Sequence, residues 1–228
     1  MYFLLNQKKK IIFGWTPKCG CSHVKNLWFY LNNMKVNYLH DETYISRLPK
    51  DINNYIIIIF TRNPYKRLVS GFLDKYKKNG QFRFKWGKKK IIFKDFVDVL
   101  VQKNYSRIER HHFSPQTSEL YDKSIFKSKT LKFYDICNID YAYIEKLFNK
   151  NIEKHIIDFK GKHLRSLFVK KEHDNQYVYN LNMDTYYLSK IDTKYFYNEE
   201  IKKKVFNHYK EDFITFYENG IDYINSPF

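Results

Sequence analysis

The sequence has few of the residues that cross-link or interrupt small proteins. Its 228 residues include three cysteines, seven glycines and five prolines. Cys19, Cys21 and Cys137 are too few and too unevenly spaced for a disulfide framework, which fits a reducing compartment. The sequence also lacks fixed-period repeats and Gly/Ser-rich or Pro-rich linkers, so we expect a single domain over residues 1–228.

Long apolar runs are missing as well. The longest, from Ile56 to Phe60, has the length of a strand, whereas a membrane span needs about 20 apolar residues. The N-terminus offers five apolar residues before a polar, Lys-rich stretch, without the apolar centre and cleavage site of a secretory signal. These absences predict a soluble, cytoplasmic-type protein with no membrane span.

The charge balance is strongly basic. The chain carries 41 Lys+Arg against 24 Asp+Glu, a formal charge of +17. A hydrophobic content of 43% excludes a disordered chain. The basic excess favours a polyanion partner, and the basic aromatic stretch 82–90 could stack on single-stranded nucleic acid or contact an anionic sugar chain. However, lysine greatly outnumbers arginine, and the sequence is rich in Ile, Asn, Tyr and Phe. An AT-rich genome produces this composition, so part of the charge reflects codon usage.

The first seventy residues alternate between strand and helix patterns. The β-branched and aromatic segments Lys10–Trp15 and Tyr55–Phe60 predict two strands. The apolar spacing over Ser22–Asn32 predicts a helix after the first strand. A second helix is predicted from Pro64, with Asn63 as its N-cap. This order predicts an α/β domain with a central parallel sheet and right-handed crossovers.

The later sequence is less regular. Apolar spacing predicts helices over Phe93–Val101, Tyr141–Phe148 and Lys202–Tyr217. The polar or basic stretches Gly80–Lys90 and Lys170–Asn182 are predicted to be irregular.

The loop after the first strand has the features of an anion site. In Thr16–His23 a strand runs into a helix N-terminus, where free backbone N–H groups and the helix dipole favour an anion. Gly20 permits close approach of the backbone, Lys18 supplies a cation, and Ser22 supplies a hydroxyl. The alternative is an ordinary turn with a surface lysine. The Walker pattern GxxxxGK[ST], which a nucleotide kinase would need, does not occur in the chain.

A second junction of this kind follows the next predicted strand. Arg62 lies at the tip of that strand, and Ser70 lies eight residues later in the following helix. Helical side chains tilt toward the helix N-terminus, so Ser70 is expected to lean toward an anion held by Arg62. The alternative for Arg62 is a surface ion pair. Since ligands of open parallel sheets bind at the carboxyl ends of the strands, the two junctions predict a ligand with two anionic groups.

These segments match a known family. TPKCGCSHVKNLW, residues 16–28, resembles the 5′-phosphosulfate loop of sulfotransferases, especially the carbohydrate sulfotransferases of the chondroitin and HNK-1 group. FTRNPYKRLVSGFLDKY, residues 60–76, resembles their 3′-phosphate motif. ERHHFSPQ, residues 109–116, resembles their HWxPQ segment, and residues 205–217 resemble their C-terminal Tyr-x-x-Asp-Phe region.

The resemblance implies the P-loop kinase-like sulfotransferase fold and the donor 3′-phosphoadenosine 5′-phosphosulfate, with no metal. It implies that Lys18 is catalytic and that Arg62 and Ser70 hold the 3′-phosphate. The acceptor implied is a carbohydrate hydroxyl, with an acidic sugar left open. The implied contacts to the 5′-phosphosulfate come from Lys18, Cys19, Gly20, Cys21, Ser22 and His23.

The same resemblance implies a general base. His112 occupies the position of the histidine in the HWxPQ segment, although the adjacent His111 remains an alternative. Phe113 replaces the usual tryptophan, which puts the local acceptor contacts in doubt.

Other kinds of site are less well supported. Cys19, Cys21 and His23 are too few for a structural zinc site, and His23 has no evident acidic partner for a cysteine nucleophile. The second hypothesis for the whole chain is a non-enzymatic nucleic-acid or polyanion-binding protein.

Overall fold

The computed structural model describes residues 1–35, 39, 42–77, 79–87, 90–117, 125, 128, 130–159, 178–183 and 191–228. The chain forms two compact units. The first contains Met1–Arg62, Gln116–Arg165 and Asn219–Ile221, and the second contains Asn63–Pro115, Ser166–Glu218 and Asp222–Phe228. Each unit is described by itself below.

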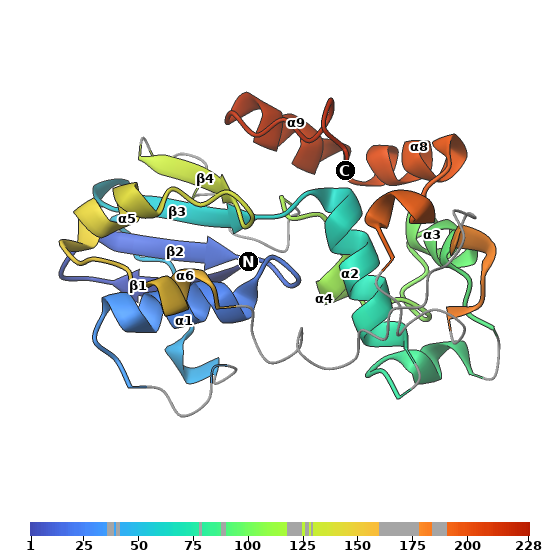
Figure 1. Ribbon diagram of the computed structural model, residues 1–228, viewed down its shortest axis with the longest axis horizontal. Coiled ribbons are helices and arrows are strands. Elements are labelled where there is room, and N and C mark those ends of the chain that lie inside the picture. Colours follow the sequence, from blue (N-terminus) through green and yellow to red (C-terminus); the bar gives the residue numbers. More distant parts are fainter. Residues whose placement is uncertain are drawn as a thin grey trace. The chain divides into compact units, whose positions relative to one another are not determined.

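The first unit is built on a four-stranded sheet (Figure 1). The strands lie in the order β1–β2–β3–β4, with β1–β2 antiparallel and the other two pairs parallel. The strands are β1 (Tyr2–Asn6), β2 (Ile11–Trp15), β3 (Ile56–Thr61) and β4 (Leu131–Asp135). The predicted α/β fold with a central parallel sheet is confirmed for β2, β3 and β4, whereas the antiparallel strand β1 was not predicted. Sequence reasoning found β2 and β3 to within one residue and missed the two outer strands.

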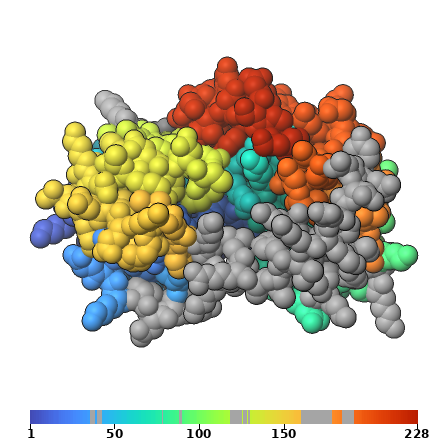
Figure 2. Space-filling model, in the orientation of Figure 1, coloured from blue at the N-terminus to red at the C-terminus, as the bar shows by residue number. Residues whose placement is uncertain are grey.

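Helices cover one face of this sheet. The helices are α1 (Cys21–Leu31), α5 (Tyr141–Phe148) and α6 (Lys154–Ile157). Phe13 lies at the centre of the buried cluster, and its ring makes edge contacts with Trp28, Phe60 and Phe148. Figure 2 shows the residues of α6 beside those of α1, and the two helices are in contact. The short 3-10 helices η1 (Glu42–Tyr44) and η2 (Ile52–Asn54) complete the described elements of this unit.

The second unit is helical over its described residues. Its α-helices are α2 (Pro64–Tyr76), α3 (Phe93–Val101), α4 (Arg110–Phe113), α8 (Glu199–His208) and α9 (Lys210–Glu218). Its 3-10 helices are η3 (Arg83–Trp86), η6 (Val178–Asn180) and η7 (Thr193–Phe196). Buried aromatic rings form its core, including Phe72, Phe93, Phe96 and Phe113.

Local chemistry explains the start of α2. The Asn63 side chain accepts hydrogen bonds from the backbone N–H groups of Tyr65 at 2.9 Å and Lys66 at 3.3 Å. Pro64 occupies the first turn, where no helical partner for its nitrogen is needed. The predicted cap is therefore confirmed.

One predicted helix was wrong. Lys202–Tyr217 was expected to form a single helix, but α8 ends at His208 and α9 begins at Lys210. The break falls at Tyr209, which is buried and donates its hydroxyl to the carbonyl of Phe113 at 2.8 Å. This anchored side chain accompanies the change of helix direction, which apolar spacing alone does not reveal.

The other predictions for the later part of the sequence are confirmed for two helices and only partly for the irregular segments. The helices α3 and α5 have the predicted bounds. The segment Gly80–Lys90 contains the short helix η3 instead of being wholly irregular. Residues 170–177 of the predicted irregular segment Lys170–Asn182 lie outside the described residues. Within the part of the chain that the structure describes, no helix has the length and apolar character needed to cross a bilayer.

Candidate active site

The carboxyl ends of three strands lie at one edge of the sheet. The register pairs Trp15 of β2 with Phe60 of β3, and Thr61 of β3 with Asp135 of β4. The 16–20 loop therefore leaves β2 beside Arg62, which follows β3. Such an edge is where open α/β sheets bind their ligands.

The 16–20 loop turns sharply before α1. The N–H of Cys19 donates to the carbonyl of Thr16 at 3.2 Å. Lys18 has a φ of 69°, which is uncommon for a non-glycine residue, and Gly20 has φ 68° and ψ 32°. A Cβ atom at Gly20 would lie 2.4 Å from Cγ1 of Ile136, at the end of β4. Glycine at position 20 therefore avoids both a strained backbone conformation and a clash with Ile136.

The first turn of α1 is suited to an anion. Gly20 is the N-cap, and no side chain of the described residues caps the helix there. The first helical hydrogen bond runs from Val24 N–H to the Gly20 carbonyl at 3.0 Å. The preceding N–H groups, of Cys21, Ser22 and His23, point out of the helix end, and the first turn contains no acidic residue. The dipole and these donors together favour a negatively charged ligand.

Arg62 lies against this loop. Its Nη1 donates to the carbonyl of Lys18 at 3.2 Å, so the structure brings together two residues that were predicted separately. This bond uses one of the five N–H donors of the guanidinium. The two cationic residues therefore belong to one site at the sheet edge.

Gln116 holds both parts of that site in place. It is 1% exposed, and its Nε2 donates to the Arg62 carbonyl at 2.8 Å. Its Oε1 accepts from the Arg62 N–H at 3.1 Å and from the Cys19 thiol at 2.9 Å. The Cys19 sulfur also lies 3.2 Å from Oγ1 of Thr16. Sequence reasoning did not assign Gln116 a role, although its place in the HWxPQ-like segment was a usable signal.

We expect Gln116→Leu to destabilise the protein by about 1–3 kcal/mol, because the partly buried backbone groups of Arg62 and the buried Cys19 thiol lose these bonds. Denaturant unfolding measures this loss. The control is Gln102→Leu at the exposed end of α3, where a change within about 0.5 kcal/mol is expected. A Gln116→Leu protein as stable as the control would show that the bonds do not stabilise the loop.

His23 is occupied by contacts within its own unit. Its Nδ1 lies 3.2 Å from the carbonyl of Phe159, and its Nε2 lies 2.8 Å from the hydroxyl of Tyr141. Burial lowers the pKa of His23, although the hydrogen bond to Phe159 opposes this shift. The backbone N–H is therefore the group of His23 that faces the helix end. The neighbouring Cys21 packs against the apolar core.

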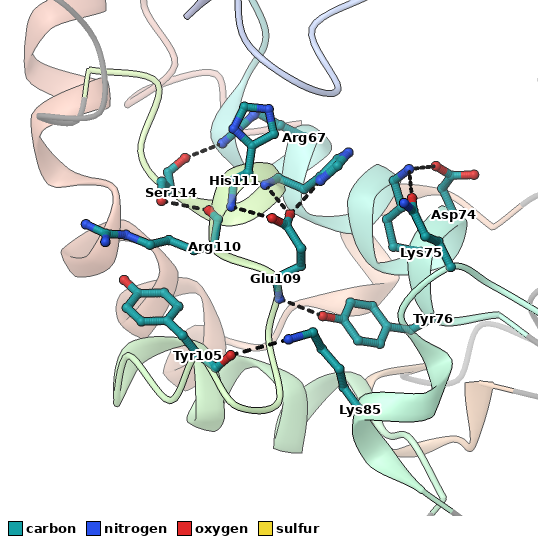
Figure 3. A network of polar contacts seen from close by, with 12 residues as sticks. Arg67, Asp74, Lys75, Tyr76, Lys85, Tyr105, Glu109, Arg110, His111 and Ser114 are labelled. Atoms are coloured by element: carbon teal, nitrogen blue, oxygen red, sulfur yellow. Dashed lines mark hydrogen bonds and ion pairs between the residues drawn. The ribbon is translucent and has the colours of Figure 1, made fainter.

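Ser70 and His112 belong to the second unit. Ser70 is half-buried in α2, roughly 9 Å along the helix axis from Pro64. His112 lies in α4, where its Nδ1 is 2.5 Å from a carboxylate oxygen of Glu109. Figure 3 shows the polar contacts around Glu109 and His111. Glu109 lies three residues before His112 in the sequence, and its contact with the His112 ring was not predicted.

A metal site has no support among the residues that the structure describes, where no three His, Cys, Asp or Glu side chains are grouped to hold an ion. The Cys19 thiol instead bonds to Gln116.

Comparison with known families agrees with the arrangement of this edge. The family model described as the sulfotransferase family matches residues 1–218. The chain belongs to the sulfotransferase family. This match covers both strand-to-helix junctions and the segment that contains Gln116 and His112. Members of the family use 3′-phosphoadenosine 5′-phosphosulfate as donor, so the family match supports the donor that the motif resemblance implied.

A relative of known name agrees with this assignment. Human carbohydrate sulfotransferase 9 is 31% identical over 87 residues, which cover 32% of this chain and 20% of that protein. The match thus spans about a fifth of the length of that relative. No solved structure matches the chain.

Proposed function

We propose that this protein transfers a sulfuryl group from 3′-phosphoadenosine 5′-phosphosulfate to an acceptor hydroxyl. The observation that carries the proposal is the contact between Arg62 and the Lys18 carbonyl, at the uncapped N-terminus of α1. The Arg62 guanidinium, the loop that carries Lys18 and several backbone donors lie there. A multiply charged nucleotide donor requires such a site.

The residues divide between holding the donor and stabilising charge. The N–H groups of Cys21, Ser22 and His23 bind the 5′-phosphate, and Arg62 and Ser70 hold the 3′-phosphate, which fixes the position of the donor. Lys18 stabilises the negative charge that develops on the 5′-phosphate as its bond to sulfur breaks.

The chemical step balances without a metal. The acceptor oxygen forms a bond to sulfur while the bond between sulfur and the bridging oxygen breaks, and the electron pair stays on the departing phosphate. His112 takes the proton of the acceptor hydroxyl. The products are a sulfate ester and adenosine 3′,5′-bisphosphate.

We propose a carbohydrate as the acceptor. The support is the printed name of the human relative, together with the motifs that resemble carbohydrate sulfotransferases. The charge of +17 would favour an acidic sugar chain.

The donor site is tested with adenosine 3′,5′-bisphosphate. At 100 times its Kd, a ligand of the folded state adds about 2.7 kcal/mol of stability, or roughly 5–10 °C in Tm for a chain of this size. We expect this shift in the natural protein and in the control Arg47→Ala, which removes an exposed charge from the same unit. We expect most of it to disappear in Arg62→Ala.

Two outcomes would contradict the proposed donor site. One is no shift in the natural protein, and the other is an undiminished shift in Arg62→Ala. Salt-sensitive binding of oligonucleotides without any response to the bisphosphate would favour the non-enzymatic polyanion-binding hypothesis.

A further inference from the structure

Glu109 makes three contacts with the two histidines that follow it. Its Oε1 accepts from the backbone N–H of His111 at 2.9 Å, and its Oε2 accepts from that of His112 at 2.7 Å. The same Oε2 lies 2.5 Å from Nδ1 of the His112 ring. One carboxylate thus caps α4 and also contacts the ring of the proposed base.

The charge of Glu109 determines where the proton lies on the ring. Burial raises the pKa of the Glu109 carboxyl, but the hydrogen bonds from His112 and His111 outweigh it and lower the pKa to about 2. Glu109 is therefore ionised at neutral pH. An ionised carboxylate only accepts hydrogen bonds, so the hydrogen between it and the ring belongs to Nδ1. In a neutral imidazole the other nitrogen, Nε2, is then the acceptor.

The surroundings hold both partners in position. The N–H of Glu109 donates to the hydroxyl of Tyr76 at 3.0 Å, and that hydroxyl donates to the Arg107 carbonyl at 3.3 Å. Tyr76 is completely buried. On the other side, the ring of Phe82 makes an edge contact with the ring of His112, with centroids 5.8 Å apart. The side chains of Glu109 and His112 each keep 20% of their surface exposed, so the pair is accessible to a substrate.

We propose that Glu109 is a positioning residue that holds His112 in the tautomer protonated at Nδ1, which leaves Nε2 to accept the proton of the acceptor hydroxyl. The proposal rests on the proposed function for the use of that nitrogen, but not for the tautomer itself. After the transfer, the carboxylate stabilises the imidazolium that forms. This arrangement also separates the two candidate bases, since Glu109 lies 2.5 Å from Nδ1 of the His112 ring, whereas its hydrogen bond with His111 is to the backbone N–H.

The first test measures the tautomer directly. Long-range ¹H–¹⁵N spectra of histidine-labelled protein above pH 7.5 distinguish a protonated from an unprotonated ring nitrogen, and the His112 signals are assigned by their loss in His112→Gln. We expect Nδ1 protonated in the natural protein. In Glu109→Gln we expect the tautomer protonated at Nε2 to appear, because the amide can donate to Nδ1 while its oxygen still caps the helix. An Nε2-protonated ring in the natural protein would overturn the proposal.

The second test measures turnover. We expect Glu109→Gln to lower kcat by about 10–100-fold, with the KM for the donor changed less than twofold. Glu153→Gln is the matched control, because Glu153 lies 3.2 Å from Nδ1 of His155 in an exposed pair far along the sequence. That variant should turn over like the natural protein.

A double variant separates positioning from a merely structural role. If Glu109 acts through His112, adding Glu109→Gln to His112→Ala should lower the residual turnover by less than about twofold. Losses that multiply would overturn the proposal. If the natural protein neither binds adenosine 3′,5′-bisphosphate nor transfers sulfate, the proposed function fails, while the tautomer measurement still decides whether Glu109 orients His112.

Discussion

Replacement of His112 by alanine is expected to lower kcat by roughly 10²–10⁴-fold, the contribution typical of a positioned general base. The stabilisation by adenosine 3′,5′-bisphosphate should be largely kept, because the contacts that arrange the 16–20 loop and Arg62 lie within the first unit. The rate is measured as transfer of labelled sulfate to an acceptor saccharide. Nucleotide binding is followed by the melting temperature of the same preparations.

His111 supplies the comparison for this prediction. Its ring lies perpendicular to that of His112, with centroids 5.5 Å apart, and burial lowers its pKa, as does the charge of His112. We expect His111→Ala to retain more than a tenth of the natural turnover. The reverse pattern, with His112→Ala active and His111→Ala inactive, would move the base to His111.

The second large effect is expected at Gly20. Alanine there must adopt a left-handed backbone at a cost of about 1–2 kcal/mol, and its Cβ would meet Ile136 at 2.4 Å. We therefore expect Gly20→Ala to destabilise the protein by about 2–4 kcal/mol in all. It should also weaken binding of adenosine 3′,5′-bisphosphate, since the loop can no longer keep its turn. Denaturant unfolding and the nucleotide-induced Tm shift measure the two effects.

Two variants divide this effect into its parts. Gly220 also has a positive φ, of 82°, but an added Cβ there would have no atom within 4 Å. Gly220→Ala therefore reports backbone strain alone, and we expect a loss of about 1 kcal/mol with nucleotide binding unchanged. Adding Ile136→Ala to Gly20→Ala should restore part of the nucleotide response by relieving the contact. Equal losses in the two single glycine variants would show that the Ile136 contact is unimportant.

The elements that could be predicted are those with a strong local pattern. The continuous apolar run of β3 and the amphipathic spacing of α3 and α5 carry their own signal. The strands β1 and β4 were not predicted; they are the two edge strands of the sheet, and their pairing with β2 and β3 stabilises them. Strand pairing is a long-range interaction, and a local pattern does not report it.

The candidate site divides in the same way. The loop of Lys18 and Gly20 and the strand tip at Arg62 could be found from strand-to-helix chemistry and a family resemblance. The contact partners of Gln116 and Glu109 could not, because each depends on how one side chain lies rather than on a sequence pattern. Gln116 bonds to Arg62, which lies 54 positions away in the sequence. The Glu109 carboxylate accepts hydrogen bonds from the first turn of α4, the short helix that follows it.

The bonds between Arg62 and Gln116 also matter for the path of the chain. Arg62 is the last residue of the first unit before the chain enters the second, and Gln116 is the first residue after it returns. Residues 63–115 therefore form a continuous segment of the second unit. The residues that flank this segment, Arg62 and Gln116, are joined by two hydrogen bonds. These two hydrogen bonds act as a non-covalent cross-link that closes the loop formed by residues 63–115. A ligand bound by Arg62 would stabilise the folded state in which these hydrogen bonds are formed. Donor binding would therefore favour the closed form of this loop.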